Sequence, residues 1–284
     1  MESILTLLLS TVILRPYVFI FLFVYLLGCS LHLGVKRTLL FAVAGYLVTW
    51  LSEYSSIHNG FPYGTYYYIE QTKGSELWVF GVPFMDSLSY VFLAYASYSM
   101  ALLTLSPLRV SNGIVYLLET RAIRNSLLTR VLGTIFLVYL DIIIDPVALQ
   151  GNRWFLGQIY GYPAEGAYFG VPISNFAGWF LVGFILLLVL QKIDYYMSIG
   201  KIKDHAGYHY KWRHLIGPAL YVGILIFNLS VTFYIGEYTM GWAGVFIIAL
   251  PLSLLFIASK KKVSRPENQN EMADHLRDFP EAVI

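Results

Sequence analysis

Long apolar runs separated by shorter polar connections dominate the pattern along this chain. A helix needs about 17 to 25 mainly apolar residues to cross a bilayer. By that measure the sequence predicts seven spans, at residues 16–34, 37–52, 84–106, 130–149, 173–190, 215–235 and 243–259. Residues 4–14 are apolar but too short to cross alone, and Pro16 should interrupt the helix there. The expected fold is therefore an all-α, polytopic membrane helix bundle of about seven transmembrane helices.

The two longest connections on one side of the predicted bundle, residues 53–83 and 150–172, are rich in Gly, Pro and Tyr. Within each, the letters FGVP lead into the next apolar run, at residues 80–86 (FGVPFMD) and 169–175 (FGVPISN). The matching positions in the hydropathy pattern indicate two copies of one membrane hairpin that together build one site.

Basic residues support this topology. All but three of the 19 Lys and Arg residues fall in alternate connections, the exceptions being Arg15, Lys73 and Arg153. The positive-inside rule assigns the basic connections to the cytoplasm. We expect a multi-pass protein of the cell membrane with one transmembrane domain at residues 1–262, a retained N-terminus and a flexible cytoplasmic tail at residues 263–284. The basic connection 107–129 has the pattern of an interfacial helix.

Composition limits the possible classes of function. Hydrophobic residues make up 57% of the chain and charged residues only 13%, which is typical of a polytopic membrane protein. The net charge is only +2 and the sequence has no concentrated basic stripe, so we expect no nucleic-acid partner. The single cysteine, Cys29, excludes an internal disulfide.

Acidic residues near the outer ends of predicted spans are the candidates for chemistry, since carboxylates at membrane depth are costly and usually functional. Asp141 and Asp145 are four residues apart and share a helix face, so repulsion and burial favour a proton on one of them. A neutral acid can protonate an alkene while an ionised neighbour stabilises the cation or deprotonates water. The candidate catalytic residues are Asp141, Asp145, Glu53 and Asp86, whereas Glu237 is expected to be structural.

Structural explanations exist for two of these acids, because Asp145 before Pro146 could simply end a helix and Glu53 could cap a loop. The loop tyrosines also allow two interpretations. They could form an interfacial belt, or they could pack on a long apolar substrate as a lid. The lid candidates are Tyr63, Tyr66, Tyr67, Tyr68, Tyr160 and Tyr168.

Several kinds of cofactor chemistry lack their usual sequence patterns. Magnesium-dependent diphosphate binding needs a second acidic cluster, which is missing, and six histidines are fewer than membrane di-iron sites use. His205, His209 and His214 lie in a basic connection, where an interfacial anchor is favoured over a metal site. Phosphate-loop, dinucleotide and serine-elbow motifs are absent from the sequence. We therefore expect a reaction that uses neither a metal nor a cofactor.

Four segments, at residues 53–68, 82–83, 141–148 and 166–179, resemble those of integral-membrane carotenoid hydratases. The most specific are the DIIIDPVA and YFGVPISNFAGW runs. The resemblance implies addition of water across the terminal carbon–carbon double bond of an acyclic C40 or C50 carotenoid end group, which leaves a tertiary alcohol. It also implies a carotenoid substrate within the bilayer, water as the second reactant, and other membrane enzymes of carotenoid synthesis as possible partners.

Together, residues and resemblance predict that Asp141 or Asp145 protonates the alkene and that water captures the cation. Glu53 and Asp86 would orient water or balance the cation, and Asn175 would hydrogen-bond the water or the new hydroxyl. Aromatic faces suit a passing carbocation. The expected substrate-binding residues are Asn175, Tyr63, Tyr66, Trp154, Tyr168, Phe169 and Trp179.

Two other functions remain open from the sequence. A membrane carotenoid cyclase, such as a lycopene cyclase, would form the same cation but capture it with an internal double bond. A proton-coupled transporter would also show repeated hairpins with buried acids. The gathering of the acids near one face argues against a transport path through the middle.

Overall fold

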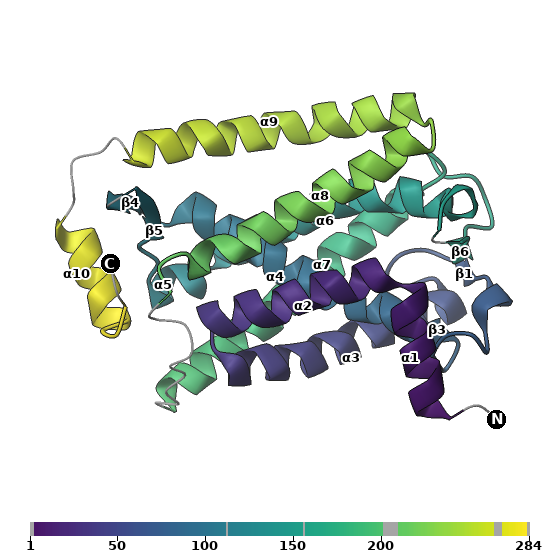
Figure 1. The fold of residues 1–284 in the computed structure, drawn as a ribbon, viewed down its shortest axis with the longest axis horizontal. Helices are drawn as coiled ribbons and strands as arrows, with labels where there is room; N and C mark the ends of the chain where they lie inside the picture. The colour runs from purple at the N-terminus through teal and green to yellow at the C-terminus, as the bar shows by residue number, and fades with distance from the viewer. Residues whose placement is uncertain (1–2, 112, 156, 201–209, 264–268, 283–284) are drawn as a thin grey trace.

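The computed structural model describes residues 3–111, 113–155, 157–200, 210–263 and 269–282. Ten α-helices lie within these ranges and form an elongated all-α bundle (Figure 1). Seven helices coincide with the predicted spans: α2 (Pro16–His32), α3 (Val35–Asn59), α4 (Phe84–Leu105), α6 (Leu127–Leu149), α7 (Ile173–Ile199), α8 (Ile216–Tyr234) and α9 (Tyr238–Val263). Short 3₁₀ turns lie at η1 (Glu70–Thr72), η2 (Gly151–Arg153) and η3 (Arg213–Leu215).

The predicted polytopic helix bundle is confirmed, but the number of seven crossings is not. Five helices of the described chain, α4, α6, α7, α8 and α9, are long and apolar enough to span a membrane. Helix α1 (Ile4–Leu14) and α2 would add a sixth span if they are counted as one, although they are bent by 95°. As predicted, the break falls at Pro16, which begins α2 because its ring fits the first helical position.

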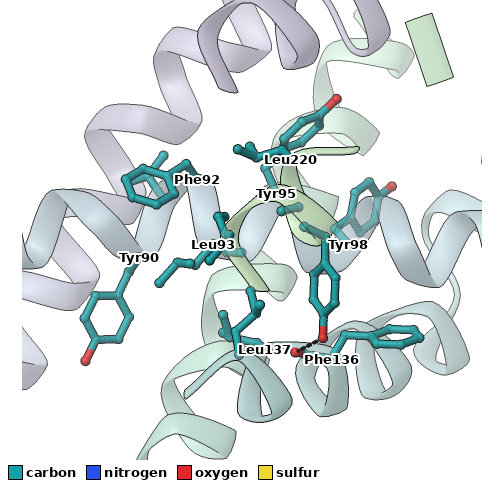
Figure 2. Packing of buried hydrophobic residues seen from close by; sticks show 14 of the residues in the cluster. Tyr90, Phe92, Leu93, Tyr95, Tyr98, Phe136, Leu137 and Leu220 are labelled. Atoms are coloured by element: carbon teal, nitrogen blue, oxygen red, sulfur yellow. Dashed lines mark hydrogen bonds between the residues drawn. The ribbon is translucent and has the colours of Figure 1, made fainter. Parts of the chain in front are cut away.

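Helix α4 is the centre of the bundle. Every residue from Tyr90 to Leu102 is buried, so the helix is covered on all sides. Figure 2 shows large side chains of α4, such as Tyr95 and Tyr98, packed with Phe136 of α6 and Leu220 of α8. The Tyr221 hydroxyl of α8 donates to the Phe136 carbonyl at 2.9 Å, which ties α8 to α6.

The two FGVP segments have the same backbone. In the first, β2 (Trp78–Val79) and β3 (Val82–Pro83) pair across a two-residue turn with φ of 50° at Phe80 and 83° at Gly81. In the second, φ is 46° at Phe169 and 85° at Gly170, and the flanking residues also bridge. Positive φ at both central positions defines the tight hairpin turn that favours glycine. The two copies therefore match as α3–turn–α4 and α6–turn–α7.

A second strand pair joins the two copies. Strands β1 (Tyr67–Tyr68) and β6 (Tyr160–Gly161) pair antiparallel, with Tyr68 opposite Tyr160. Each strand belongs to the loop of a different copy, so the pairing fixes the two loops against each other. We call the end of the bundle that carries these loops the loop end, and the opposite end the tail end (Figure 1).

The tail end differs from the sequence prediction in two places. Residues 107–129 do not form an interfacial helix, but a hairpin of β4 (Leu108–Ser111) and β5 (Ile114–Leu117), followed by the short helix α5 (Arg121–Arg124). Gly113, with φ of 74°, and the β-branched start of β5 favour this turn. The sequence predicts a flexible tail, but residues 269–282 are ordered. They include helix α10 (Gln269–Asp278), and Phe279 is only 2% exposed.

Candidate functional site

Four of the five candidate acids lie together at the loop end of the bundle. Glu53 comes from α3, Asp86 from the first turn of α4, and Asp141 and Asp145 from α6. Glu53, Asp141 and Asp145 are buried, and Asp86 is half-buried. The ion pairs found among the described residues include none of these four carboxylates. The fifth acid, Glu237, instead pairs with Arg153 near the surface, which agrees with a structural role.

Asn175 joins the two aspartates of α6. It occupies the third position of α7, equivalent to Asp86 in the first copy of the hairpin. Its amide nitrogen donates to Asp141 Oδ2 at 3.1 Å and to Asp145 Oδ2 at 2.7 Å. The amide N–H groups that were predicted to meet water or product are thus directed at the carboxylates. The other oxygen of Asp141, Oδ1, is buried and has no hydrogen-bond partner among the described residues.

Hydroxyl groups are the other donors to the cluster. The Tyr68 hydroxyl donates to Asp86 Oδ2 at 2.7 Å, and the Ser87 hydroxyl donates to Glu53. The Tyr162 hydroxyl donates to Asp145 Oδ2 at 3.4 Å. These acids are therefore solvated by neutral hydroxyl and amide groups, an arrangement that leaves carboxyls able to gain and lose protons.

Two cavities meet at the carboxylates. The first, which we call the tyrosine cavity, has a volume of about 40 Å³ and is lined by Glu53, Tyr63, Tyr66, Tyr68, Asp86, Tyr90, Asp145, Tyr160, Tyr162, Asn175 and Trp179. The second, the apolar cavity, has a volume of about 90 Å³ and lies between α2, α4, α6 and α8. Its walls include Tyr17, Phe21, Phe92, Leu93, Ile144, Trp154 and Ile224. Asp86, Tyr90, Asp145, Tyr160 and Trp179 line both cavities.

The structure brings most of the predicted site residues to these cavities. Glu53, Asp86, Asp145, Asn175, Tyr63, Tyr66 and Trp179 line the tyrosine cavity, and Trp154 lines the apolar cavity. Asp141 reaches the cluster through Asn175. Tyr168 and Phe169, in contrast, line neither cavity. Phe169 is 38% exposed at its hairpin turn, and its ring packs against the ring of Tyr168.

Comparison with known proteins identifies the family of the chain. The family model described as carotenoid biosynthesis protein matches residues 4–255. The chain belongs to this family. It is also 31% identical over 159 residues to bisanhydrobacterioruberin hydratase of Haloarcula japonica, a match that covers 55% of this chain and 45% of that protein. The match thus spans about half the length of this relative. No solved structure matches the chain.

Some residues of this family member's site were missed from the sequence. Tyr90 and Tyr162 line the tyrosine cavity, and Ser87 donates to Glu53. Spacing carries a signal for two of them, since Ser87 follows Asp86 directly and Tyr90 lies one helical turn beyond it. Tyr162 follows Tyr160 by two residues in the same aromatic loop.

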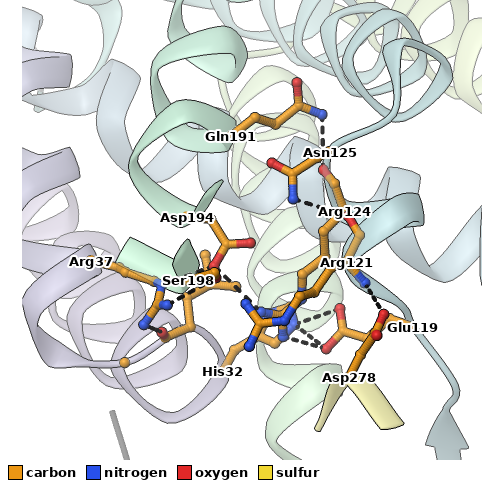
Figure 3. Close-up of polar contacts among 12 residues, drawn as sticks. His32, Arg37, Glu119, Arg121, Arg124, Asn125, Gln191, Asp194, Ser198 and Asp278 are labelled. Carbon is orange, nitrogen blue, oxygen red and sulfur yellow. Dashed lines mark hydrogen bonds and ion pairs between the residues drawn. The ribbon is translucent and has the colours of Figure 1, made fainter. Parts of the chain in front are cut away.

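A second buried cluster lies at the tail end, and we call it the tail-end network (Figure 3). Arg124 Nη2 donates to Glu119 Oε1 at 2.6 Å, and Arg37 Nε lies 2.8 Å from Asp194 Oδ1. Arg124 also lies 3.7 Å from Asp194, so the two ion pairs are joined. Burial alone would raise the pKa of Glu119, but the charge of Arg124 and the nearby imidazole groups hold it well below its ordinary value.

Histidines complete the tail-end network. His32 Nε2 lies 3.0 Å from Glu119 Oε1, and His214 Nδ1 lies 3.3 Å from the same oxygen. His214 is 5% exposed, so the prediction that it is an interfacial anchor is wrong, while His205 and His209 fall outside the described residues. The three possible ligand atoms lie within 4.8 Å of one another, but Arg124 bonds to the same carboxylate and its charge opposes a bound cation.

Proposed function

We propose that this protein is a carotenoid hydratase that adds water to the terminal double bond of an acyclic carotenoid end group. The observation that carries the proposal is the position of Asp86 and Asp145, which line both an apolar cavity and a hydroxyl-lined cavity. A hydration of this kind must bring an apolar chain and water to one acid. The family match and the hydratase name of the relative support the same reaction class.

The apolar cavity suits the end of a linear isoprenoid chain. Aliphatic and aromatic side chains make up most of its lining, as in other sites that bind apolar ligands. Tyr90 and Trp179 stack with ring centroids 4.2 Å apart at the boundary with the tyrosine cavity. Aromatic faces at this point would stabilise a carbocation that forms beside them.

The proposed mechanism begins with Asp145, which unlike Asp141 lines both cavities. Its carboxyl proton adds to the less substituted alkene carbon, so that a C–H bond forms, the π bond breaks and a tertiary cation results. The oxygen of a water molecule then bonds to the cation, and the water proton passes to the Asp145 carboxylate. The acid is regenerated, and the net reaction is alkene plus water to tertiary alcohol.

Neighbouring groups would prepare Asp145 for both roles. Asp141 shares the Asn175 amide with it, and two adjacent buried carboxyls cannot both ionise without a large cost, so the pair retains a proton. Asp86 accepts a hydrogen bond from Tyr68, and in its ionised form it would place a negative charge near the cation. Glu53 would complete the acidic wall of the tyrosine cavity.

The same proposal includes the setting of the reaction. The carotenoid would enter from the lipid of the cell membrane, and the basic tail end would face the cytoplasm. The residues proposed to act need neither a metal nor a cofactor, and other membrane enzymes of carotenoid synthesis would supply or consume the pigment.

A carotenoid cyclase is the second candidate, because the same acid and aromatic wall could guide an internal double bond to the cation. The cluster of tyrosine hydroxyls directly beside Asp145 favours water as the capturing group. A proton-coupled transporter is less favoured, since the four unpaired acids gather at one end of the bundle.

The test is expression in a host that accumulates a linear carotenoid, with water enriched in heavy oxygen and mass spectrometry of the pigments. A hydratase yields pigment heavier by one water that carries the label. A product of unchanged mass with a shifted absorption spectrum would identify a cyclase, and label derived from molecular oxygen would identify an oxygenase. Unchanged pigments together with an electrogenic signal in proteoliposomes would favour the transporter.

A further inference from the structure

One hydroxyl of the tyrosine cavity has no part in the mechanism above. Tyr160 lines both cavities, and its hydroxyl is buried beside the Asp145 carboxylate, with no hydrogen bond of normal geometry among the described residues. Leaving a buried polar group without a well-formed hydrogen bond is unfavourable. A hydroxyl of this kind is therefore expected to meet a water molecule or a substrate group.

The fold holds Tyr160 firmly in this position. Strand β6 pairs with β1, and the Ile69 amide donates to the Ile159 carbonyl at 2.7 Å beside it. The rings of Tyr66 and Tyr162 pack edge-on against Tyr160, with centroids 6.2 Å and 6.0 Å away. The strand pairing between the two hairpin copies thus fixes one hydroxyl at the junction of the cavities.

The electrostatic surroundings keep this hydroxyl in its donor form. Burial, followed by the negative charge of Asp145, raises the pKa of Tyr160 well above its ordinary value. A protonated phenol can donate to a water oxygen, and the nearby carboxylate can accept one of the water protons. The second lone pair of the water oxygen remains available to attack a carbon atom.

We propose that the tyrosine cavity is the water site of the reaction and that Tyr160 holds the attacking water against Asp145. This inference rests on the proposed hydratase function. Water oxygen forms the new C–O bond to the tertiary cation, and the O–H bond that breaks delivers its proton to the Asp145 carboxylate. Without a held water, the cation loses a carbon-bound proton to the same carboxylate and returns to an alkene. Tyr160 therefore determines whether the cation is hydrated or loses a proton and returns to an alkene.

A reaction run in deuterium oxide distinguishes these two outcomes for the cation. Protonation followed by return leaves deuterium in the recovered carotenoid, whereas capture yields the deuterated alcohol. For Tyr160→Phe we expect at least tenfold less alcohol, with deuterium exchange into the carotenoid maintained or increased. The matched control is Tyr67→Phe on the paired strand, because Tyr67 is 50% exposed and lines neither cavity. The unfolding midpoint of Tyr160→Phe should change little, since the hydroxyl that is removed makes no hydrogen bond of normal geometry within the part of the chain that the structure describes.

The other possible results of this experiment would contradict either the role of Tyr160 or the hydratase function. A wild-type ratio of alcohol to deuterated carotenoid in Tyr160→Phe would overturn the inference while the hydratase function stands. Loss of both products, with or without a lower unfolding midpoint, would also overturn it, because Tyr160 would then serve protonation or packing. Failure of the wild-type protein to form either product would instead reject the proposed function.

Discussion

The two ends of this bundle each bury a group of charged side chains, but they neutralise those charges in different ways. At the tail end, Glu119 and Asp194 lie against the guanidinium groups of Arg124 and Arg37. At the loop end, the donors to Asp86, Asp141 and Asp145 are hydroxyl and amide groups. Breaking a buried ion pair leaves an uncompensated charge, whereas an acid held by neutral donors can exist with or without its proton.

This difference indicates how to separate structural from functional charge in a membrane protein. Both clusters are buried, so burial alone does not distinguish them. The tail-end network connects α2, α3, α5, α7 and η3, and it pairs Arg124 and Arg37 with Glu119 and Asp194 (Figure 3). The loop-end acids instead border open cavities and remain available to a substrate. We therefore expect substitutions at the tail end to change stability and substitutions at the loop end to change activity.

The largest effect on activity is expected from Asp145→Asn. The amide has the size of the acid but cannot give or take the proton, so hydration should fall by about 100-fold or more. Pigment analysis by chromatography and mass spectrometry measures the loss. Glu237→Gln is the matched acid-to-amide control at the same end of the bundle, and it should keep wild-type activity. An active Asp145→Asn would remove Asp145 from the mechanism.

The largest effect on stability is expected from Glu119→Gln. Removing one partner of a buried ion pair typically costs about 3 to 5 kcal/mol, and in this variant Arg124 and Arg37 would have to share the single carboxylate of Asp194. Thermal or denaturant unfolding in detergent measures the change. A variant as stable as wild type would show that the tail-end network does not hold the bundle together.

The pH dependence of the free energy of unfolding tests the contribution of the tail-end ion pairs separately. The pKa of Glu119 in the folded protein lies well below its ordinary value of 4.5. Its contribution is therefore fully present above pH 4.5 and is lost as the pH falls through the folded pKa. Wild-type protein should lose stability as the pH falls below 4.5, and Glu119→Gln should show a flatter profile there. Equal slopes for both proteins would contradict the assignment.

An intermediate effect is expected from Asn175→Ala, which removes the donor shared by Asp141 and Asp145. The two carboxylates would lose their fixed orientation, and activity should fall on the order of tenfold. The fall should appear in kcat with little change in KM, because the amide contacts the acids. Gln191→Ala offers a contrast at the tail end, where the Gln191 amide donates to the Arg124 carbonyl at 2.9 Å, and should affect stability instead.

The smallest effect is expected at the hairpin turns. Gly170→Ala forces an alanine to adopt φ near 85°, which costs about 1 to 2 kcal/mol. Gly81→Ala in the first copy should cost a similar amount, since φ there is 83°. Unfolding midpoints of both variants check this equivalence, and a large difference between them would argue against matching roles of the two turns.

Much of the fold follows from the sequence because membrane-spanning helices can be recognised by the length of their apolar runs. Each of the seven predicted ranges falls on one helix, although three of them extend one or two residues past its ends, and the FGVP repeat correctly indicated a duplicated hairpin. The loops were harder to predict. Tyr168 and Phe169 lie at a turn with positive φ at Phe169 and line neither cavity, and the apolar pattern does not report turn geometry.

Long-range pairing explains the other differences. The acids could be placed at one depth from hydropathy, but their donors could not, since Asn175 and Asp141 are 34 residues apart in sequence. The tail-end network was missed for the same reason. Asp194 has no acidic partner nearby in sequence, and its partners Arg37 and Arg124 come from distant segments. Residues 269–282 looked too polar to pack, yet Phe279 lies beneath the Arg124 guanidinium at 4.4 Å.

The most direct test of the account measures Asp145→Asn and Glu119→Gln side by side, with incorporation of heavy oxygen from water and the unfolding midpoint determined on the same preparations. We expect opposite outcomes for the two variants. Asp145→Asn should lose incorporation and keep its midpoint, and Glu119→Gln should lose stability and keep incorporation per folded molecule. Incorporation at the wild-type rate by Asp145→Asn would contradict the central claim that the unpaired carboxylates of the loop end carry out the chemistry.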